Sequence, residues 1–103
     1  MEKGDRFNKG KPRWSLVDFK SLESMVRVLE FGANKYGDRN WEKGLDKKEI
    51  LESAMRHLVA LFNGEEIDKE SGELHSAHLM CNAMFYTHFS LKITNNNENM
   101  ANK

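Results

Sequence analysis

Cysteine and proline are nearly absent from this sequence, and neither sign of charge is in excess. The single cysteine, Cys81, excludes an internal disulfide and a zinc site of four cysteines. Lysine and arginine together number 16, as do aspartate and glutamate, so the formal net charge is zero. Duplex-DNA-binding domains normally carry a basic excess, so we expect no duplex nucleic acid among the partners. A small anionic ligand needs only a local basic patch.

Long apolar runs are also missing. No stretch is long enough to span a bilayer, and the N-terminal residues lack the apolar segment of a signal peptide. We therefore expect a cytoplasmic protein that does not contact a membrane. With 103 residues, 39% of them hydrophobic and 31% charged, the chain has the composition of one ordinary globular domain.

The sequence shows no convincing strand alternation and no internal repeat, whereas three segments repeat apolar residues at steps of three and four. Such periodicity predicts amphipathic helices from about Asp18 to Lys35, from Asp46 to about Asn63, and from about Glu73 to Leu91. Glu49 stands three residues after Asp46 and predicts a capping box, and Ser71 is placed to cap the third helix.

The predicted fold is an all-α small helical bundle. Residues 1–94 form a single nucleotide-binding domain with an N-terminal basic arm, and residues 95–103 form a polar, disordered tail. Val28 and Phe31 lie off the main apolar stripe of the first helix, which indicates a second buried side against a partner chain. Three helices of this size expose too much apolar surface alone, so we expect a homo-oligomer. The main stripe of the first helix comprises Leu22, Met25, Val26, Leu29, Ala33 and Tyr36.

The strongest candidate cluster lies in the third helix, where His75, His78 and Asn82 share one face at steps of three and four. Two imidazoles and an amide on one face can bind a metal ion, a phosphate or the edge of a base. The spacing alone is equally consistent with partly exposed histidines on an ordinary helix.

His57 lies near the apolar stripe of the second helix, where a histidine is more often part of the core than a ligand. The loop to the third helix is short, however, so antiparallel packing would bring His57 towards His75 and His78. The same loop is acidic, and Glu65 and Asp68 can face a phosphate chain through Mg²⁺, which prefers oxygen ligands. Composition alone favours an ordinary solvated loop.

Glu49 and Glu52 stand one helical turn apart in the second helix, and carboxylates at that spacing can share a divalent metal ion. A simpler interpretation is that Glu49 only caps the helix and that Glu52 pairs with Arg56.

A second patch lies between the first two helices. Lys35 and Lys43 can meet phosphate, Asn40 can bind a base edge, and Tyr36 or Trp41 can stack on a base. Alternatively, both aromatic residues are core anchors flanked by solvated charges. The N-terminal arm can close over a triphosphate or form only a surface segment, and its basic residues are Arg6, Lys9, Lys11 and Arg13.

Taken in order, several short segments carry a family pattern: Arg6-Phe7-Asn8-Lys9-Gly10-Lys11, Tyr36-Gly37, Asn40-Trp41, Arg56-His57, Gly64-Glu65-Glu66-Ile67-Asp68, Ser71-Gly72, His75, His78 and Asn82. This pattern resembles the N-terminal domain of the phage dATP/dGTP diphosphohydrolases, a family with a MazG-like fold. The resemblance covers about residues 5–89, and its segments are specific in combination.

The resemblance implies an all-α enzyme that forms a homodimer or homotetramer. It implies Mg²⁺-dependent hydrolysis of a purine (deoxy)nucleoside triphosphate to the monophosphate and pyrophosphate, with Mn²⁺ or another divalent ion as a substitute. A phage-encoded member would act in the host cytoplasm. The metal ligands would be Glu49, Glu52, Glu65 and Asp68, and the catalytic residues His57, Asp68, His75 and His78. The substrate contacts would be Arg6, Lys9, Lys11, Lys35, Tyr36, Asn40, Trp41, Lys43 and Asn82.

The sequence departs from the MazG pattern at one point. MazG proteins carry a second pair of carboxylates where this chain has His75-Ser76-Ala77-His78. Glu65 and Asp68 are then the substitutes, and histidine-rich ligation favours a transition metal. The departure also supports an alternative function, a non-catalytic phage protein that sequesters a host nucleotide signal. Metal-dependent product formation separates the two hypotheses, and failure to bind any nucleotide would favour a third, an interaction module with structural histidines.

Overall fold

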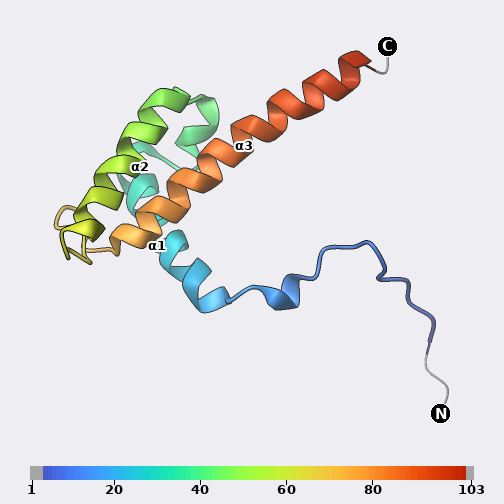
Figure 1. Cartoon of the computed structure of the whole chain (residues 1–103), viewed down its shortest axis with the longest axis horizontal. Helices are drawn as coiled ribbons and strands as arrows, with labels where there is room; N and C mark the ends of the chain where they lie inside the picture. The colour runs from blue at the N-terminus through green and yellow to red at the C-terminus, as the bar shows by residue number, and fades with distance from the viewer. Residues whose placement is uncertain (1–3, 102–103) are drawn as a thin grey trace.

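The computed structural model describes residues 4–101 and shows a bundle of three α-helices (Figure 1). Within this range the only pairing of strand type is an isolated bridge between Ile67 and Leu74. The predicted all-α small bundle is confirmed. The helical elements in chain order are the 3-10 helix η1 (Trp14–Leu16), α1 (Phe19–Tyr36), the 3-10 helix η2 (Asn40–Lys43), α2 (Lys47–Phe62) and α3 (His75–Ala101).

Capping residues set the ends of α1 and α2. The Asp18 carboxylate accepts a hydrogen bond from Lys20 N at 3.2 Å, and Asp46 accepts one from Lys48 N at 2.9 Å. Each bond satisfies an amide that has no partner in the first turn of a helix. α1 ends before Gly37, whose φ of +99° is open to glycine without steric cost. The predicted bounds of both helices are therefore confirmed to within a residue or two.

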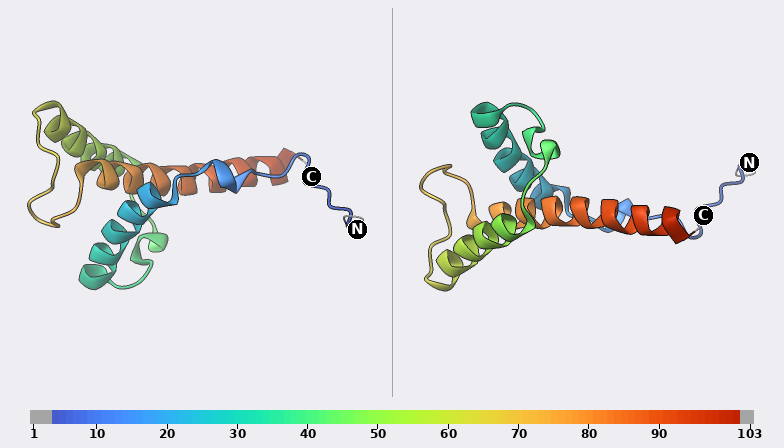
Figure 2. Two further views of the ribbon diagram at one scale, coloured as in Figure 1. Left: turned by 90° about the horizontal axis from the view of Figure 1, so that it is seen from below. Right: turned by 90° about the horizontal axis from the view of Figure 1, so that it is seen from above.

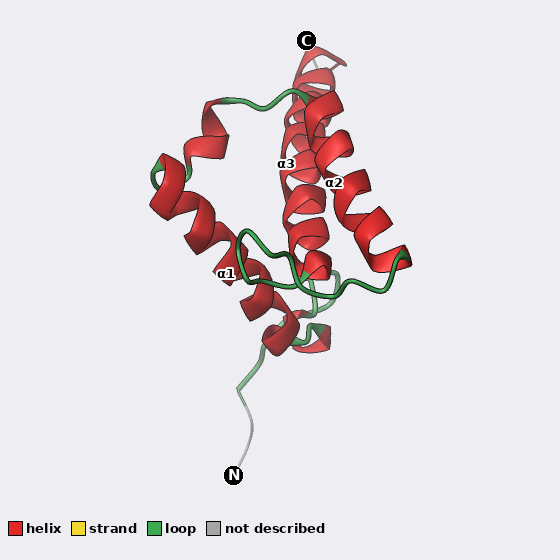
Figure 3. Cartoon of the chain, turned by 90° about the vertical axis from the view of Figure 1, so that its left-hand side faces the viewer, coloured by secondary structure: helices red, strands yellow, loops and turns green. Residues whose placement is uncertain are grey.

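α3 is the central helix, and its first half packs against both α1 and α2 (Figure 3). Val28 of α1 lies 7% exposed against Ala77 and Cys81 of α3. The prediction that Val28 faces a partner chain is therefore wrong, because the small side chains of α3 let this side of α1 approach closely. Two residues of the predicted stripe, Val26 and Tyr36, are instead exposed.

α1 and α2 lie on opposite sides of α3 and diverge from it (Figure 2). The second half of α3 extends beyond both of them. An exposed arm, residues 4–13, leads away from the bundle and contains no helix, as the sequence predicts. None of the helices within residues 4–101 has both the length and the apolar character needed to cross a membrane.

α3 begins later and ends later than the sequence predicts. Asp68 N donates to the carbonyl of Glu73 at 2.8 Å, and His75 N donates to the carbonyl of Glu66 at 2.9 Å. These bonds hold the preceding loop in a bridge, so the helix begins at His75 and Ser71 does not cap it. At the other end α3 continues through residues 95–101, where the composition predicts a disordered tail, because each residue added to a formed helix gains a hydrogen bond. Residues 102–103 lie outside the described residues.

Candidate functional site

The loop between α2 and α3 folds around the carboxylate of Asp68. The backbone N–H and the hydroxyl of Ser71 both donate to Asp68 Oδ2, at 3.0 and 2.8 Å. Gly72 N donates to the Asp68 carbonyl at 2.7 Å, and Glu73 N donates to Ser71 Oγ at 3.2 Å. Gly72 adopts a φ of +74° here, which a larger residue would adopt only with strain. The turn therefore fixes Asp68 beside the first turn of α3.

Three of the four histidines converge on this carboxylate from two helices. The Nδ1 atoms of His57, on α2, and His75, on α3, lie 2.8 Å apart. The rings of His57 and His78 stack with their centroids 4.3 Å apart and an angle of 7° between their planes. The predicted approach of His57 to the two histidines of α3 is confirmed, because α2 and α3 pack together.

His75 and His78 have different surroundings. His78 Nε2 lies 2.7 Å from Ser71 Oγ and 3.5 Å from Asp68 Oδ2. Because the Ser71 hydroxyl donates to Asp68, we assign the ring proton of His78 to Nε2, which donates to Ser71. His75 is 5% exposed, and its Nε2 has no hydrogen-bond partner among the described residues. Glu65 Oε2 lies 3.7 Å from that nitrogen.

The electrostatics of the cluster favour neutral rings of His57 and His78 beside an ionised Asp68. Burial lowers the pKa of His57, and the charges of His78 and His75 lower it further. Burial also lowers the pKa of His78, against the opposing effect of Asp68. Burial alone would raise the pKa of Asp68, but the two hydrogen bonds from Ser71 outweigh it, and this pKa is lowered. At neutral pH His57 and His78 therefore offer imidazole lone pairs beside the negative charge of Asp68.

The side chains of His57, Asp68 and His75 form a group that can hold a metal ion. Each offers one ligand atom, and these atoms lie within 4.8 Å of one another. Across residues 4–94, where side chains are described, no other three residues of ligating type come together in this way.

The residues of the second predicted patch have different surroundings: one packs against α3, and the others lie at the surface. Trp41 packs against α3, with ring centroids 5.0 Å from Phe85 and 4.9 Å from His88, so it anchors η2 as in the simpler interpretation of the sequence. Lys35 Nζ donates to Glu70 Oε1 at 3.1 Å and so ties the end of α1 to the acidic loop. Tyr36 is 63% exposed, and Lys35 Nζ lies over its ring, 5.3 Å from the centroid.

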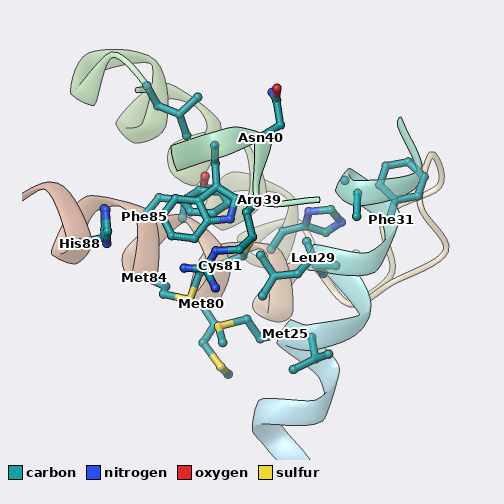
Figure 4. Close-up of a pocket in the computed structure, with 18 of the residues that line it drawn as sticks. Met25, Leu29, Phe31, Arg39, Asn40, Met80, Cys81, Met84, Phe85 and His88 are labelled. Atoms are coloured by element: carbon teal, nitrogen blue, oxygen red, sulfur yellow. The ribbon is translucent and has the colours of Figure 1, made fainter. Parts of the chain in front are cut away.

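An open groove of about 1290 Å³ runs between α1 and α3 (Figure 4). Arg39, Asn40 and Trp41 line one part of it. Asn82 and His78 also line it, and the groove reaches the histidine cluster at His78. Asn82 Nδ2 donates to Ser53 Oγ at 3.2 Å, which fixes its amide. The walls of the groove are mainly apolar and are formed by Met25, Val26, Leu29, Met80, Met84 and Phe85.

The remaining predicted phosphate contacts are not gathered at the cluster. Arg6, Lys9 and Lys11 are exposed on the arm that leads away from the bundle. Lys43 is exposed at the end of η2. The three arm residues meet a ligand at the cluster only if the arm folds back or belongs to a second copy.

Comparison with known sequences gives a clear assignment. Residues 1–99 match the family model described as dATP/dGTP diphosphohydrolase, N-terminal. The chain belongs to this family. A dATP/dGTP diphosphohydrolase of Salmonella phage PMBT28 is 38% identical over 82 residues, which are 80% of this chain and 28% of the relative. The chain thus spans less than a third of the length of the curated relative it matches. No solved structure matches it.

Mg²⁺ is the ion that we expect for a dATP/dGTP diphosphohydrolase domain, and the cluster does not fit it. Mg²⁺ demands near-octahedral oxygen ligation, whereas two of the three converging side chains are imidazoles. Glu49 lies eight residues before His57, about 12 Å along the axis of α2. Both Glu49 and Glu52 are exposed and lie outside the group. The four carboxylates predicted as metal ligands therefore do not come together within residues 4–94 of a single chain.

Two contributors to the site of this family member were missed by sequence reasoning. Ser71 links Asp68 to His78 instead of capping a helix, and its place three residues after Asp68 is the signal that could have found it. Arg39 has a φ of +50° and lies over the Trp41 ring, with 5.5 Å from Cζ to the ring centroid. No sequence motif indicates that backbone conformation.

Proposed function

We propose that this chain carries the site at which a purine deoxynucleoside triphosphate, dATP or dGTP, is hydrolysed to the monophosphate and pyrophosphate. The observation that carries the proposal is the convergence of His57, Asp68 and His75 in a member of the dATP/dGTP diphosphohydrolase family. The phage relative carries this activity in its name, and its matching region corresponds to this chain.

In the proposed reaction, a water oxygen forms a bond to the α-phosphorus and the bond to the bridging oxygen of the β-phosphate breaks. A divalent ion held by His57, Asp68 and His75 would neutralise phosphate charge and activate the water. His78 is our candidate for accepting the proton of that water or for contacting a phosphate, since Ser71 holds its ring beside the group.

The groove between α1 and α3 is the proposed site for the nucleoside. Asn40 and Asn82 have amides that can bind a purine edge, and both line the groove. Tyr36 can stack on the base, whereas Trp41 is already engaged with Phe85. The proposed phosphate contacts are Lys35, Lys43 and the arm residues Arg6, Lys9 and Lys11.

We test the proposal by incubating the purified chain with each dNTP and NTP, with Mg²⁺, Mn²⁺ or Zn²⁺ and with EDTA, and separating products by chromatography. The expected result is ion-dependent release of dAMP or dGMP and pyrophosphate. Asp68→Asn should abolish this release, because it removes the negative ligand atom. Glu23→Gln, an exposed carboxylate of α1 in a surface pair with Arg27, is the matched control and should retain it.

Intact nucleotide under every condition would overturn the proposal. Nucleotide that stays bound to the chain and is recovered unchanged after denaturation would instead support the non-catalytic binder. That function is favoured by one observation, the failure of the predicted carboxylates to assemble in a single chain.

A further inference from the structure

We propose that His57, Asp68 and His75 form a binding site for a borderline transition-metal ion of the Zn²⁺ class, in preference to Mg²⁺. Two nitrogens and one oxygen are a common protein ligand set for zinc, and three protein ligands leave a position open for water or phosphate. The inference concerns ion binding alone, so it stands whether or not the chain hydrolyses nucleotides.

The distances suit a single ion. The three ligand atoms lie within 4.8 Å of one another, and the Nδ1 atoms of His57 and His75 are 2.8 Å apart. Two ligands of one zinc ion, each about 2.0–2.1 Å from the metal, are separated by roughly 3–4 Å. Small side-chain rotations therefore bring all three atoms into coordination.

The buried imidazole of His75 is the second and independent observation. Its side chain is 7% exposed, and its Nε2 lacks a hydrogen-bond partner among the described residues. If Nδ1 binds a metal ion, the ring proton sits on Nε2, which faces Glu65 Oε2 at 3.7 Å. A carboxylate behind a metal-bound histidine is the usual support for such a ligand. Nδ1 of His75 would then bind the ion, and Glu65 would support the ring through its other nitrogen.

The neighbours of Asp68 hold one of its carboxylate oxygens and leave the other accessible. Both hydrogen bonds from Ser71 go to Oδ2, and His78 Nε2 also approaches Oδ2. No hydrogen bond within the described part of the chain reaches Oδ1, so this oxygen remains available to a metal ion. A carboxylate whose second oxygen is fixed by neighbours is an oriented ligand.

The selectivity follows from the donor atoms. Imidazole suits zinc, copper, iron and nickel, whereas Mg²⁺ prefers oxygen ligands and keeps several waters. His78 stacks on the ring of His57 and directs Nε2 to Ser71, so it lies beside the ligand set as a support.

The test is titration of the chelator-stripped chain with Co²⁺, followed by visible absorption, and competition with Zn²⁺ and Mg²⁺. We expect one Co²⁺ per chain with the intense visible bands of low coordination, displaced by one equivalent of Zn²⁺ and unaffected by millimolar Mg²⁺. Bound Co²⁺ that lacks these intense bands, or that is displaced by Mg²⁺, would overturn the proposal.

Variants separate this site from adventitious binding to histidine. His57→Asn and Asp68→Asn should each abolish the bands, and Glu65→Gln should weaken binding about 10-fold through the support of His75. His88→Asn removes the remaining histidine, which packs on Trp41, and should leave binding unchanged. Circular dichroism checks that each variant folds. Loss of the bands in folded His88→Asn, or their retention in folded Asp68→Asn, would contradict the assignment.

Discussion

The residues of the candidate site could be predicted from the sequence, but the contacts between them could not. The steps between His75, His78 and Asn82 predict a shared helical face, and a short acidic loop predicts the approach of His57. The role of Ser71 depends instead on the turn that wraps Asp68, which no periodicity encodes. Such turns decide whether a carboxylate faces the candidate metal group or the solvent. For this reason the sequence alone could not show that Asp68 joins the group while Glu49 and Glu52 stay exposed.

Ser71→Ala tests the turn around Asp68. The substitution removes a hydroxyl that bonds Asp68, His78 and Glu73 N, and we expect it to lower the free energy of unfolding by about 1–2 kcal/mol. Urea denaturation provides the measurement. Ser76→Ala, which changes an exposed serine in the first turn of α3, should alter stability little. Equal stability of the two variants would show that the turn does not depend on the hydroxyl.

Cys81 gives a prediction about alkaline pH. Burial raises the pKa of its thiol to about 11, whereas an unfolded thiol ionises near pH 8.5. The folded state therefore disfavours the thiolate, and this residue lowers stability as the pH rises from about 9 towards 11. At pH 8 an aromatic disulfide reagent should label native protein slowly and denatured protein at once. Equal labelling rates would mean that Cys81 is not buried.

At the scale of the helices, the sequence predicted a helix end correctly where a single capping residue sets that end. Asp18, Asp46 and Gly37 predict the ends of α1 and α2, because caps act over one turn. The start of α3 was missed by two residues, since the bridge between Ile67 and Leu74 pairs residues seven positions apart and competes with helix formation. The sequence also predicted the wrong buried face for α1, because that face is set by the small residues of α3 against which Val28 packs.

Asp46→Ala should destabilise the chain by about 1 kcal/mol, through the loss of the bond to Lys48 N. Glu49→Ala is the matched variant. The sequence predicts a reciprocal bond from Glu49 to complete a capping box, yet none occurs in the described residues, so a smaller loss is expected. Thermal unfolding of both variants makes the comparison, and a larger loss for Glu49→Ala would show that the reciprocal bond forms in solution.

At the scale of the whole molecule, one chain leaves much apolar surface uncovered. It exposes 8776 Å², whereas a folded monomer of this mass exposes about 6,000 Å². Its radius of gyration is 17.9 Å, against about 13 Å for a compact domain of 100 residues. On α2, a stripe at steps of four, three and four is solvent-exposed, formed by Leu51, Met55, Leu58 and Phe62. We therefore propose that copies of this chain pair through such faces, as a homodimer or homotetramer.

Sedimentation measures this directly. The wild-type chain should sediment at two or more times its mass of 12.0 kDa. Met55→Glu places a charge in the stripe and should shift the population towards single chains, because burying an unpaired charge is costly. Arg56→Glu, one position away on the polar side of α2, is the control. A wild-type chain that sediments as a monomer would contradict the proposed assembly.

The most direct test of the site as a whole is to observe the imidazole nitrogens by ¹⁵N NMR, since the chain has four histidines. A non-hydrolysable dGTP analogue is added to protein already saturated with the divalent ion. We predict that the signals of His57, His75 and His78 shift, because phosphate fills the open position of the ion that they surround. Unchanged signals from these three rings, in a protein that binds the analogue, would place the phosphates elsewhere and contradict the assignment of this cluster as the functional site.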